Sequence, residues 1–236
     1  MANLNSQYVD LKVDDGTSML AWVSRPAAEE PKRGLLVFQE AFGVNAHIRD
    51  VTNRFAALGY TAIAPELFHR TVPPKWEGGY TDFPAVMPHL QALTETGLEN
   101  DVRATYNWLI GNSAAGANVG CIGFCMGGRA AFLANSILPF KAAVSYYGGN
   151  IPMLLGRTAR LSAPMLLVWG ELDHHIPVEH RNQVTAAMRE AKKEYIDVVF
   201  SNADHGFFCD ERASYQPKAA RLAWDLTKSF LDSHQL

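Results

Sequence analysis

The chain has no surplus of positive charge and no apolar run that approaches the length needed to cross a membrane. Its 236 residues carry a formal net charge of -3, so it lacks the basic surface that recruits phosphate backbones. We therefore expect neither a nucleic acid nor a membrane as partner. Hydrophobic residues make up 48% of the sequence, which is the composition of a globular protein with a substantial core.

Cysteines are few and unpaired in the sequence. The three are Cys121, Cys125 and Cys209. None has a C-x-x-C partner, and the first residues lack the basic and apolar regions of a secretory signal, so we expect reduced thiols and a cytoplasmic protein. Asp173, His174 and His175 could suggest metal, but adjacent histidines on an extended segment point to opposite sides and no third ligand follows at a recognisable spacing. We expect no metal and no cofactor.

Short runs rich in β-branched residues alternate with stretches whose apolar residues recur at helical spacing. The expected strands are Tyr8–Val13, Met19–Ser24, Gly34–Phe38, Thr61–Ala64, Asn118–Phe124, Ala142–Tyr146, Met165–Gly170 and Tyr195–Phe200. The expected helices are Ile48–Leu58, Leu98–Ile110, Arg129–Ile137, Val178–Ala191 and Tyr215–Leu231. Such alternation predicts an α/β fold with a mostly parallel central sheet of about eight strands and helices on both faces. Asp14-Asp15-Gly16 indicates a hairpin, and so an antiparallel edge.

One segment, residues 69–96, interrupts this alternation. It contains four prolines, a Gly-Gly pair and three aromatic residues, so we expect a long irregular loop or a partial helix. Long loops in compact domains often cover a functional site, and the aromatic content favours a substrate-covering lid over a surface excursion without a role. No repeat or composition break marks a second domain, and we expect residues 1–236 to form a single one.

The most informative motif is Gly123-Phe124-Cys125-Met126-Gly127-Gly128, which ends an expected strand and precedes an expected helix. Such a turn strains its central residue, and only small neighbours allow the helix and strands to approach closely enough to hold it. It is the nucleophile elbow of α/β hydrolases with sulfur in place of oxygen. The turn would direct Cys125 outward at a helix N-terminus, whose partial positive charge favours a thiolate. The alternative is a cysteine that merely packs in the core.

An acid and a histidine follow two later strands. Asp173 comes after Met165–Gly170, and His205 comes after Tyr195–Phe200. The order Cys125, Asp173, His205 is the chain order of the α/β-hydrolase triad. His205 would take the thiol proton, and Asp173 would accept the other imidazole N–H. A solvated loop histidine and a helix-capping or turn aspartate are the alternatives, but they leave this order unexplained.

Glu40 directly follows the strand Gly34–Phe38, where α/β hydrolases place an oxyanion-hole loop. We expect the backbone N–H groups of Ala41 and Met126 to donate to a developing oxyanion. A carboxylate beside the cysteine would oppose thiolate formation or hold the thiol proton by hydrogen bonding, which keeps the resting site unreactive. The alternative for Glu40 is a solvated loop acid.

Five segments together resemble the dienelactone hydrolase (carboxymethylenebutenolidase) family. They span residues 39–51, 60–68, 123–129, 146–149 and 205–207. The resemblance extends from about Gly34 to the C-terminal helix, and it implies a monomeric, cofactor-free enzyme that hydrolyses lactones or esters with a Cys-His-Asp triad. It further implies an acyl-enzyme on Cys125. A glutamate matching Glu40 is implied to contact the thiol and to take its proton when substrate binds.

The sequence departs from the dienelactone-specific members four residues beyond His205. Those members have an arginine there that clamps the substrate carboxylate, whereas this chain has Cys209, with Arg212 further along. Arg70 and Lys75 are uncertain counterparts of a second clamp arginine. Bidentate recognition is demanding in geometry, so we do not expect dienelactone itself as the substrate. Seven aromatic residues around the expected site suggest a pocket with aromatic walls, although packing in the core is the default interpretation of each one. They are Phe42, Trp76, Tyr80, Tyr146, Tyr147, Phe207 and Phe208.

The sequence thus predicts a cysteine-dependent hydrolase of a carboxylic ester or lactone. A general carboxylesterase or thioesterase would use the same residues and differ only in its pocket. A catalytically idle hydrolase-fold protein with a binding or redox role would show damage among the three triad residues, and the sequence shows none.

Overall fold

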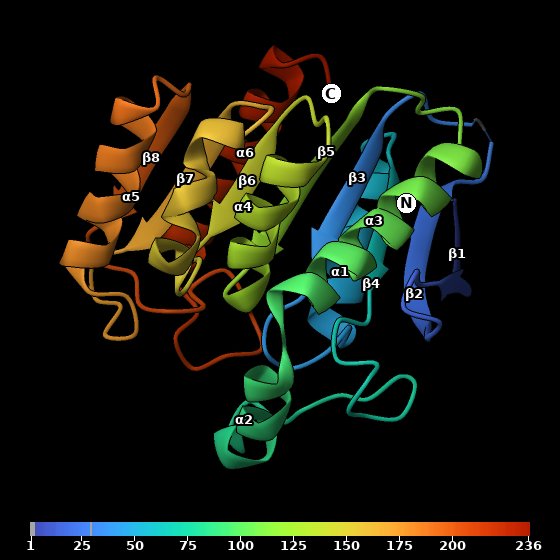
Figure 1. Cartoon of the computed structure of the whole chain (residues 1–236), viewed down its shortest axis with the longest axis horizontal. Coiled ribbons are helices and arrows are strands. Elements are labelled where there is room, and N and C mark those ends of the chain that lie inside the picture. The colour runs from blue at the N-terminus through green and yellow to red at the C-terminus, as the bar shows by residue number, and fades with distance from the viewer. Residues whose placement is uncertain (1–2, 29) are drawn as a thin grey trace. The chain divides into compact units, whose positions relative to one another are not determined.

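The computed structural model describes residues 3–28 and 30–236 as alternating strands and helices (Figure 1). The strands are β1 (Leu4–Lys12), β2 (Ser18–Pro26), β3 (Gly34–Phe38), β4 (Thr61–Pro65), β5 (Val119–Phe124), β6 (Ala143–Tyr146), β7 (Met165–Gly170) and β8 (Tyr195–Phe200). The helices are α1 (Ala46–Ala57), α2 (Phe83–Ala92), α3 (Glu95–Gly111), α4 (Met126–Ile137), α5 (Val178–Glu190), α6 (Pro217–Ser233) and the 3₁₀ helix η1 (Ile151–Arg160). The chain divides into two compact units, which meet in sequence between Val119 and Gly120.

In the first unit the strands are ordered β1-β2-β4-β3. β1 and β2 pair in antiparallel fashion from Leu4 opposite Pro26 to Lys12 opposite Ser18, β2 is also antiparallel to β4, and β4 is parallel to β3. The hairpin predicted at residues 14–16 is therefore present. Figure 1 shows α3 in front of these strands and α1 behind them.

The second unit contains β5-β6-β7-β8 in that order, all parallel. Figure 1 shows α4 and α5 in front of these strands and α6 behind them. Every residue of β5, β6 and β7 is buried, as expected of parallel strands covered on both faces. β8, the last strand in the order, keeps partly and fully exposed residues throughout. The predicted mixed fold of eight mostly parallel strands with helices is confirmed.

Residues 69–96 hold an irregular stretch followed by α2, which confirms the partial helix. Asp82 caps α2 by accepting a hydrogen bond from the Ala85 N–H at 3.3 Å, and Pro84 occupies the first turn, where a missing N–H costs nothing. Only Val86 of α2 is buried. The role of this segment as a lid stays a prediction. Among the described residues, no helix is long and apolar enough to span a membrane.

Candidate active site

The turn between β5 and α4 has the geometry of a strained elbow. Cys125 adopts φ 55° and ψ -119°, outside the regions that non-glycine residues favour, and α4 begins at the next residue. A Cβ atom on Gly123 would overlap the carbonyl oxygen of Gly127, and one on Gly128 would crowd the Cα of Gly148. Because only glycine fits at both positions, the sequence around Cys125 permits the close approach that holds the strain.

Asp173 and His205 form a direct pair in the second unit. The His205 Nδ1 lies 2.8 Å from Asp173 Oδ2. The other carboxylate oxygen of Asp173 accepts hydrogen bonds from the N–H groups of His175 at 2.8 Å and Ile176 at 3.1 Å. Burial opposes ionisation of Asp173, but these bonds and the nearby imidazoles outweigh it and lower the pKa of Asp173. Asp173 therefore holds His205 as an anionic acceptor.

Cys125 completes the cluster from the elbow. Its side chain interacts with the His205 imidazole, whose Nδ1 is engaged by Asp173. Burial disfavours the imidazolium, but Cys125 and Asp173 outweigh burial and raise the pKa of His205 to about 10. The three residues are thus brought together, with His205 between Cys125 and Asp173.

The rings of two further residues contact the His205 ring. Tyr147 lies with its ring centroid 5.1 Å away and His175 also at 5.1 Å, at interplanar angles of 60° and 71°. Tyr147 is fully buried, whereas His175 is exposed. From the sequence His175 was a candidate only for a metal ligand, because its contact with His205 depends on two loops that are distant in sequence.

In the first unit, the loop after β3 carries the predicted Glu40 and Ala41. Both are buried. Gln39 fixes the start of the loop, since its side chain donates to the Glu40 carbonyl at 3.2 Å and accepts from the Leu67 N–H at 3.1 Å. The catalytic roles of Glu40 and Ala41, and that of Met126 at the start of α4, stay predictions.

The same loop is held by residues 76–80. The Gly78 N–H donates to the Phe42 carbonyl at 3.1 Å, and Asn45 Nδ2 donates to the Tyr80 hydroxyl at 2.8 Å. The rings of Phe42 and Tyr80 meet edge to face at 4.7 Å, and Trp76 packs against the same small cluster. Three predicted pocket aromatics, Phe42, Trp76 and Tyr80, are therefore neighbours, and Trp76 and Tyr80 are only partly buried.

Comparisons with known proteins agree over almost the whole length. The model of the dienelactone hydrolase family matches residues 19–235. A protein of Synechocystis sp. that is provisionally assigned as a carboxymethylenebutenolidase is 34% identical over 224 residues, which cover 90% of each chain. An Escherichia coli K12 protein with the same assignment is 33% identical over 220 residues, or 89% of this chain and 80% of its own. The chain belongs to the dienelactone hydrolase family.

Solved structures support the same conclusion about this family member. The crystal structure of a protein from Klebsiella pneumoniae, provisionally assigned as a dienelactone hydrolase, superposes with a TM-score of 0.89 at 31% identity, covering 98% of this chain and 99% of the other. A dienelactone hydrolase-like promiscuous phosphotriesterase from metagenomic libraries shares the fold at a TM-score of 0.85 and 22% identity. The predicted family, the α/β-hydrolase fold and the prediction of an ester or lactone hydrolase are confirmed.

The remaining predicted pocket aromatics of this dienelactone hydrolase family member lie in the second unit, and they are buried. Tyr146, Tyr147 and Phe207 have no exposed surface. The Tyr146 hydroxyl is hydrogen-bonded to Thr227 Oγ1 at 2.7 Å, and its ring contacts Phe124 at 5.0 Å. Phe208, also buried, stacks on Phe124 at 5.3 Å. These contacts are those of core residues, which was the default interpretation for each of them.

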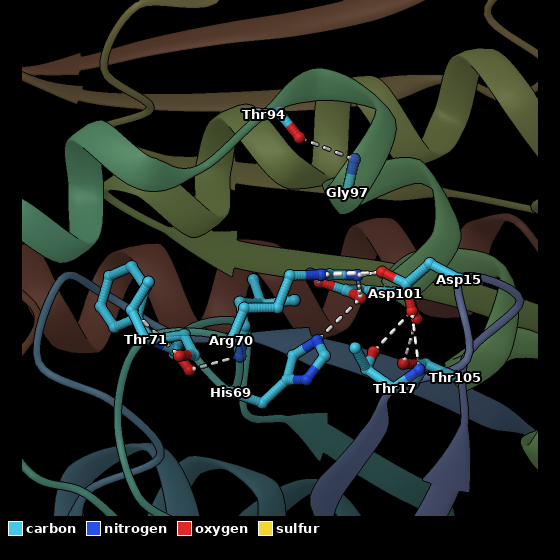
Figure 2. Close-up of polar contacts among 12 residues, drawn as sticks. Asp15, Thr17, His69, Arg70, Thr71, Thr94, Gly97, Asp101 and Thr105 are labelled. Atoms are coloured by element: carbon cyan, nitrogen blue, oxygen red, sulfur yellow. Dashed lines mark hydrogen bonds and ion pairs between the residues drawn. The ribbon is translucent and has the colours of Figure 1, made fainter.

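The positions that the sequence analysis compared with clamp arginines are engaged differently. Cys209 is completely buried. Arg70 donates to both oxygens of Asp101, at 2.9 and 2.8 Å, and to Asp15 Oδ2 at 2.6 and 2.8 Å (Figure 2). Asp101 was not predicted as a partner of Arg70, because its position within the helical pattern of α3 gave no signal of a buried ion pair.

Proposed function

We propose that this protein hydrolyses a carboxylic ester or lactone through an acyl-enzyme on Cys125. The observation that carries the proposal is the linked set of Cys125, His205 and Asp173, with the Asp173–His205 bond at 2.8 Å. A nucleophile (Cys125) that contacts a base (His205), which in turn is oriented by an acid (Asp173), is an arrangement suited to acyl transfer. The family of the chain, whose name describes a lactone hydrolase, supports the same reaction class.

The first half of the reaction would form a thioester. With the Cys125 proton held on His205 Nε2, the sulfur attacks the carbonyl carbon of the substrate as a thiolate. The carbonyl oxygen becomes an oxyanion, for which the N–H groups of Ala41 and Met126 are the proposed donors. Met126 is the first residue of α4, where backbone N–H groups have no partner within the helix. Collapse of this intermediate expels the alkoxide, which takes the proton from His205.

The second half would release the acid. Water loses a proton to His205 as its oxygen attacks the thioester carbon, and the sulfur leaves as a thiolate beside the imidazolium. Asp173 keeps the imidazole in one tautomer in both halves because it accepts from Nδ1. A lactone opened in this way gives one hydroxy acid, and an ester gives an acid and an alcohol.

Glu40 would add a control on the thiol. We propose that its carboxylate opposes thiolate formation in the resting enzyme, and that it accepts the thiol proton when substrate binds and passes it to His205. The burial of Glu40 supports this proposal, because a carboxylate shielded from water acts more strongly on a nearby group than a solvated one does.

We propose that the substrate carries no carboxylate, because neither residue compared with a clamp arginine is available to bind one. Cys209 has no exposed surface, and the N–H donors of Arg70 are engaged by Asp101 and Asp15. A neutral lactone or ester would need neither residue. A thioester is the second candidate, since the same three catalytic residues would serve it. The absence of a nucleic acid partner, the monomeric state and the cytoplasmic location stay predictions from the sequence.

The test is substitution of the nucleophile. We expect Cys125→Ala to abolish hydrolysis of p-nitrophenyl acetate, and wild-type protein mixed with this ester to gain the mass of one acetyl group on the peptide containing Cys125. Cys121→Ala is the matched control, because Cys121 is fully buried and burial raises the pKa of its thiol. Retained hydrolysis in Cys125→Ala at the wild-type rate would contradict the proposal.

A further inference from the structure

On the side of Asp173, one hydrogen bond orients the imidazole of His205. A single hydrogen bond still allows the ring to rotate about the axis of that bond. Two aromatic rings limit that motion. Tyr147 and His175 both approach to 5.1 Å between ring centroids, and both rings are steeply inclined to the imidazole. Tyr147 belongs to the buried core, but His175 contacts the same ring from an exposed position. An exposed side chain against a buried ring is the unusual feature here.

His175 also contacts the other member of the pair. Its backbone N–H donates to Asp173 Oδ1 at 2.8 Å, which leaves Oδ2 directed at His205. The electrostatic effect of the His175 side chain adds to the lowering of the Asp173 pKa, after burial, the His205 contacts and this backbone bond. One residue thus acts on both Asp173 and His205.

The loops that carry these residues are joined by backbone hydrogen bonds. The Leu172 N–H donates to the Ala203 carbonyl at 3.0 Å, and the Glu171 N–H donates to the Phe200 carbonyl at 2.9 Å. Ile176, next to His175, is buried. The backbone of His175 is therefore fixed relative to the loop of His205, so its ring contact is a defined part of the fold.

We propose that His175 is a positioning residue of this site, whose ring holds the His205 imidazole in the orientation that directs Nε2 at Cys125. The inference rests on the proposed function of Cys125 and His205. The ring acts through His205 and not through the substrate, so its aromatic shape is what the site requires. Small displacements of a catalytic base reduce turnover strongly, while substrate binding is unaffected.

The neighbouring residue provides a matched control. His174 is exposed and directly precedes His175 in the same loop, and within the part of the chain that the structure describes its side chain makes no hydrogen bond or ring contact with Asp173 or His205. His175→Ala and His174→Ala each remove one exposed imidazole from the same loop. A difference between them therefore reports the contact with His205 and not the loss of a surface histidine.

The experiment compares His175→Ala, His175→Phe, His175→Asn and His174→Ala by steady-state hydrolysis of p-nitrophenyl acetate and by the rate of Cys125 alkylation with iodoacetamide. We expect His175→Ala to lower kcat by about five- to tenfold, the scale of a lost ring–ring contact, with KM unchanged. Phenylalanine keeps the ring and should restore most of kcat, whereas asparagine should not. Alkylation, which involves no ester, should slow in the same order. His174→Ala should match wild type.

Three results would overturn the inference. The first is an equal kcat for His175→Ala and His174→Ala. The second is a kcat near that of wild type in His175→Asn but not in His175→Phe. The third is a change in His175→Ala that is confined to KM. The last two would indicate a substrate contact. Thermal unfolding confirms that each variant is folded, which we expect because the substituted side chain is exposed. Cys125→Ala separates the two proposals, since activity surviving in that variant contradicts the nucleophile and not the ring contact alone.

Discussion

Arg70 and Asp101 form a bidentate ion pair in which the carboxylate has no exposed surface. His69 Nε2 lies 3.1 Å from the same carboxylate, so two successive residues after β4 are joined to α3 (Figure 2). A buried charge needs such partners, because its desolvation is otherwise uncompensated. Arg70 therefore fixes the start of the irregular stretch that leads to α2, which is a structural task.

Removal of the guanidinium should destabilise the fold strongly. We expect Arg70→Ala to lower the free energy of unfolding by about 3–5 kcal/mol, since it leaves Asp101 buried without its main partner. Asp15→Ala removes the other, exposed partner of Arg70 and should destabilise the fold far less, because solvent screens exposed ion pairs. Urea denaturation followed by circular dichroism measures both. A normal stability of Arg70→Ala, combined with a raised KM for carboxylate-bearing esters only, would instead identify Arg70 as a substrate clamp.

The link between Cys125 and His205 can be tested by titration. The cysteine is the largest of the causes that raise the pKa of His205 to about 10, while burial acts against it. The wild-type imidazole should therefore stay protonated through neutral pH and lose its proton only near pH 10. Cys125→Ala removes the raising partner but not the burial, so the pKa of His205 should fall. NMR titration of the histidine ring protons measures this shift.

Histidines other than His175, which contacts the His205 ring, serve as internal controls in that titration, since Cys125→Ala should leave their signals unchanged. Asp173→Asn should also lower the pKa of His205, because it replaces an anionic acceptor by a neutral one. A His205 signal that titrates identically with and without Cys125 would show that the two side chains are not partners.

Local sequence patterns predicted the central strands well. The bounds of β3, β7 and β8 agree with the prediction because each is a short apolar or β-branched run with clear ends. β1 begins at Leu4, four residues earlier than predicted, since its first residues pair with β2 through backbone groups that leave no side-chain pattern. The helix η1 was not predicted, because its proline and glycine are typical of loops.

The candidate site was predictable only where order along the chain carries information. Cys125, Asp173 and His205 each follow a strand, and the ends of parallel strands lie at one edge of a sheet. The contact of His175 with His205 and the burial of Asp101 depend on how separate segments pack. Tyr146 and Phe207 are fully buried, and their proposed place in the walls of a pocket stays a prediction.

The proposed control by Glu40 predicts opposite changes in two rates. In Glu40→Gln the neutral amide no longer opposes thiolate formation, so alkylation of Cys125 by iodoacetamide at mildly acidic pH should become faster. Turnover of p-nitrophenyl acetate should fall by roughly tenfold or more, because the proposed proton acceptor is lost. Glu190→Gln, at an exposed position in α5, is the control and should change neither rate. Identical alkylation profiles from pH 5 to 9 would contradict the role of Glu40.

The lack of a free clamp predicts which lactones this protein prefers. A carboxylate-bearing substrate gains affinity only where a guanidinium can meet it in bidentate geometry, and here Cys209 is buried while Arg70 is held by Asp101 and Asp15. A neutral lactone should therefore have a higher kcat/KM than the same lactone with an added carboxylate, by about tenfold or more. Matched pairs of lactones, assayed at 50 mM and 300 mM salt, measure the preference. A preference for the acid that weakens with salt would show that another cation, such as Arg212, supplies the clamp, because screening reduces attraction between exposed charges.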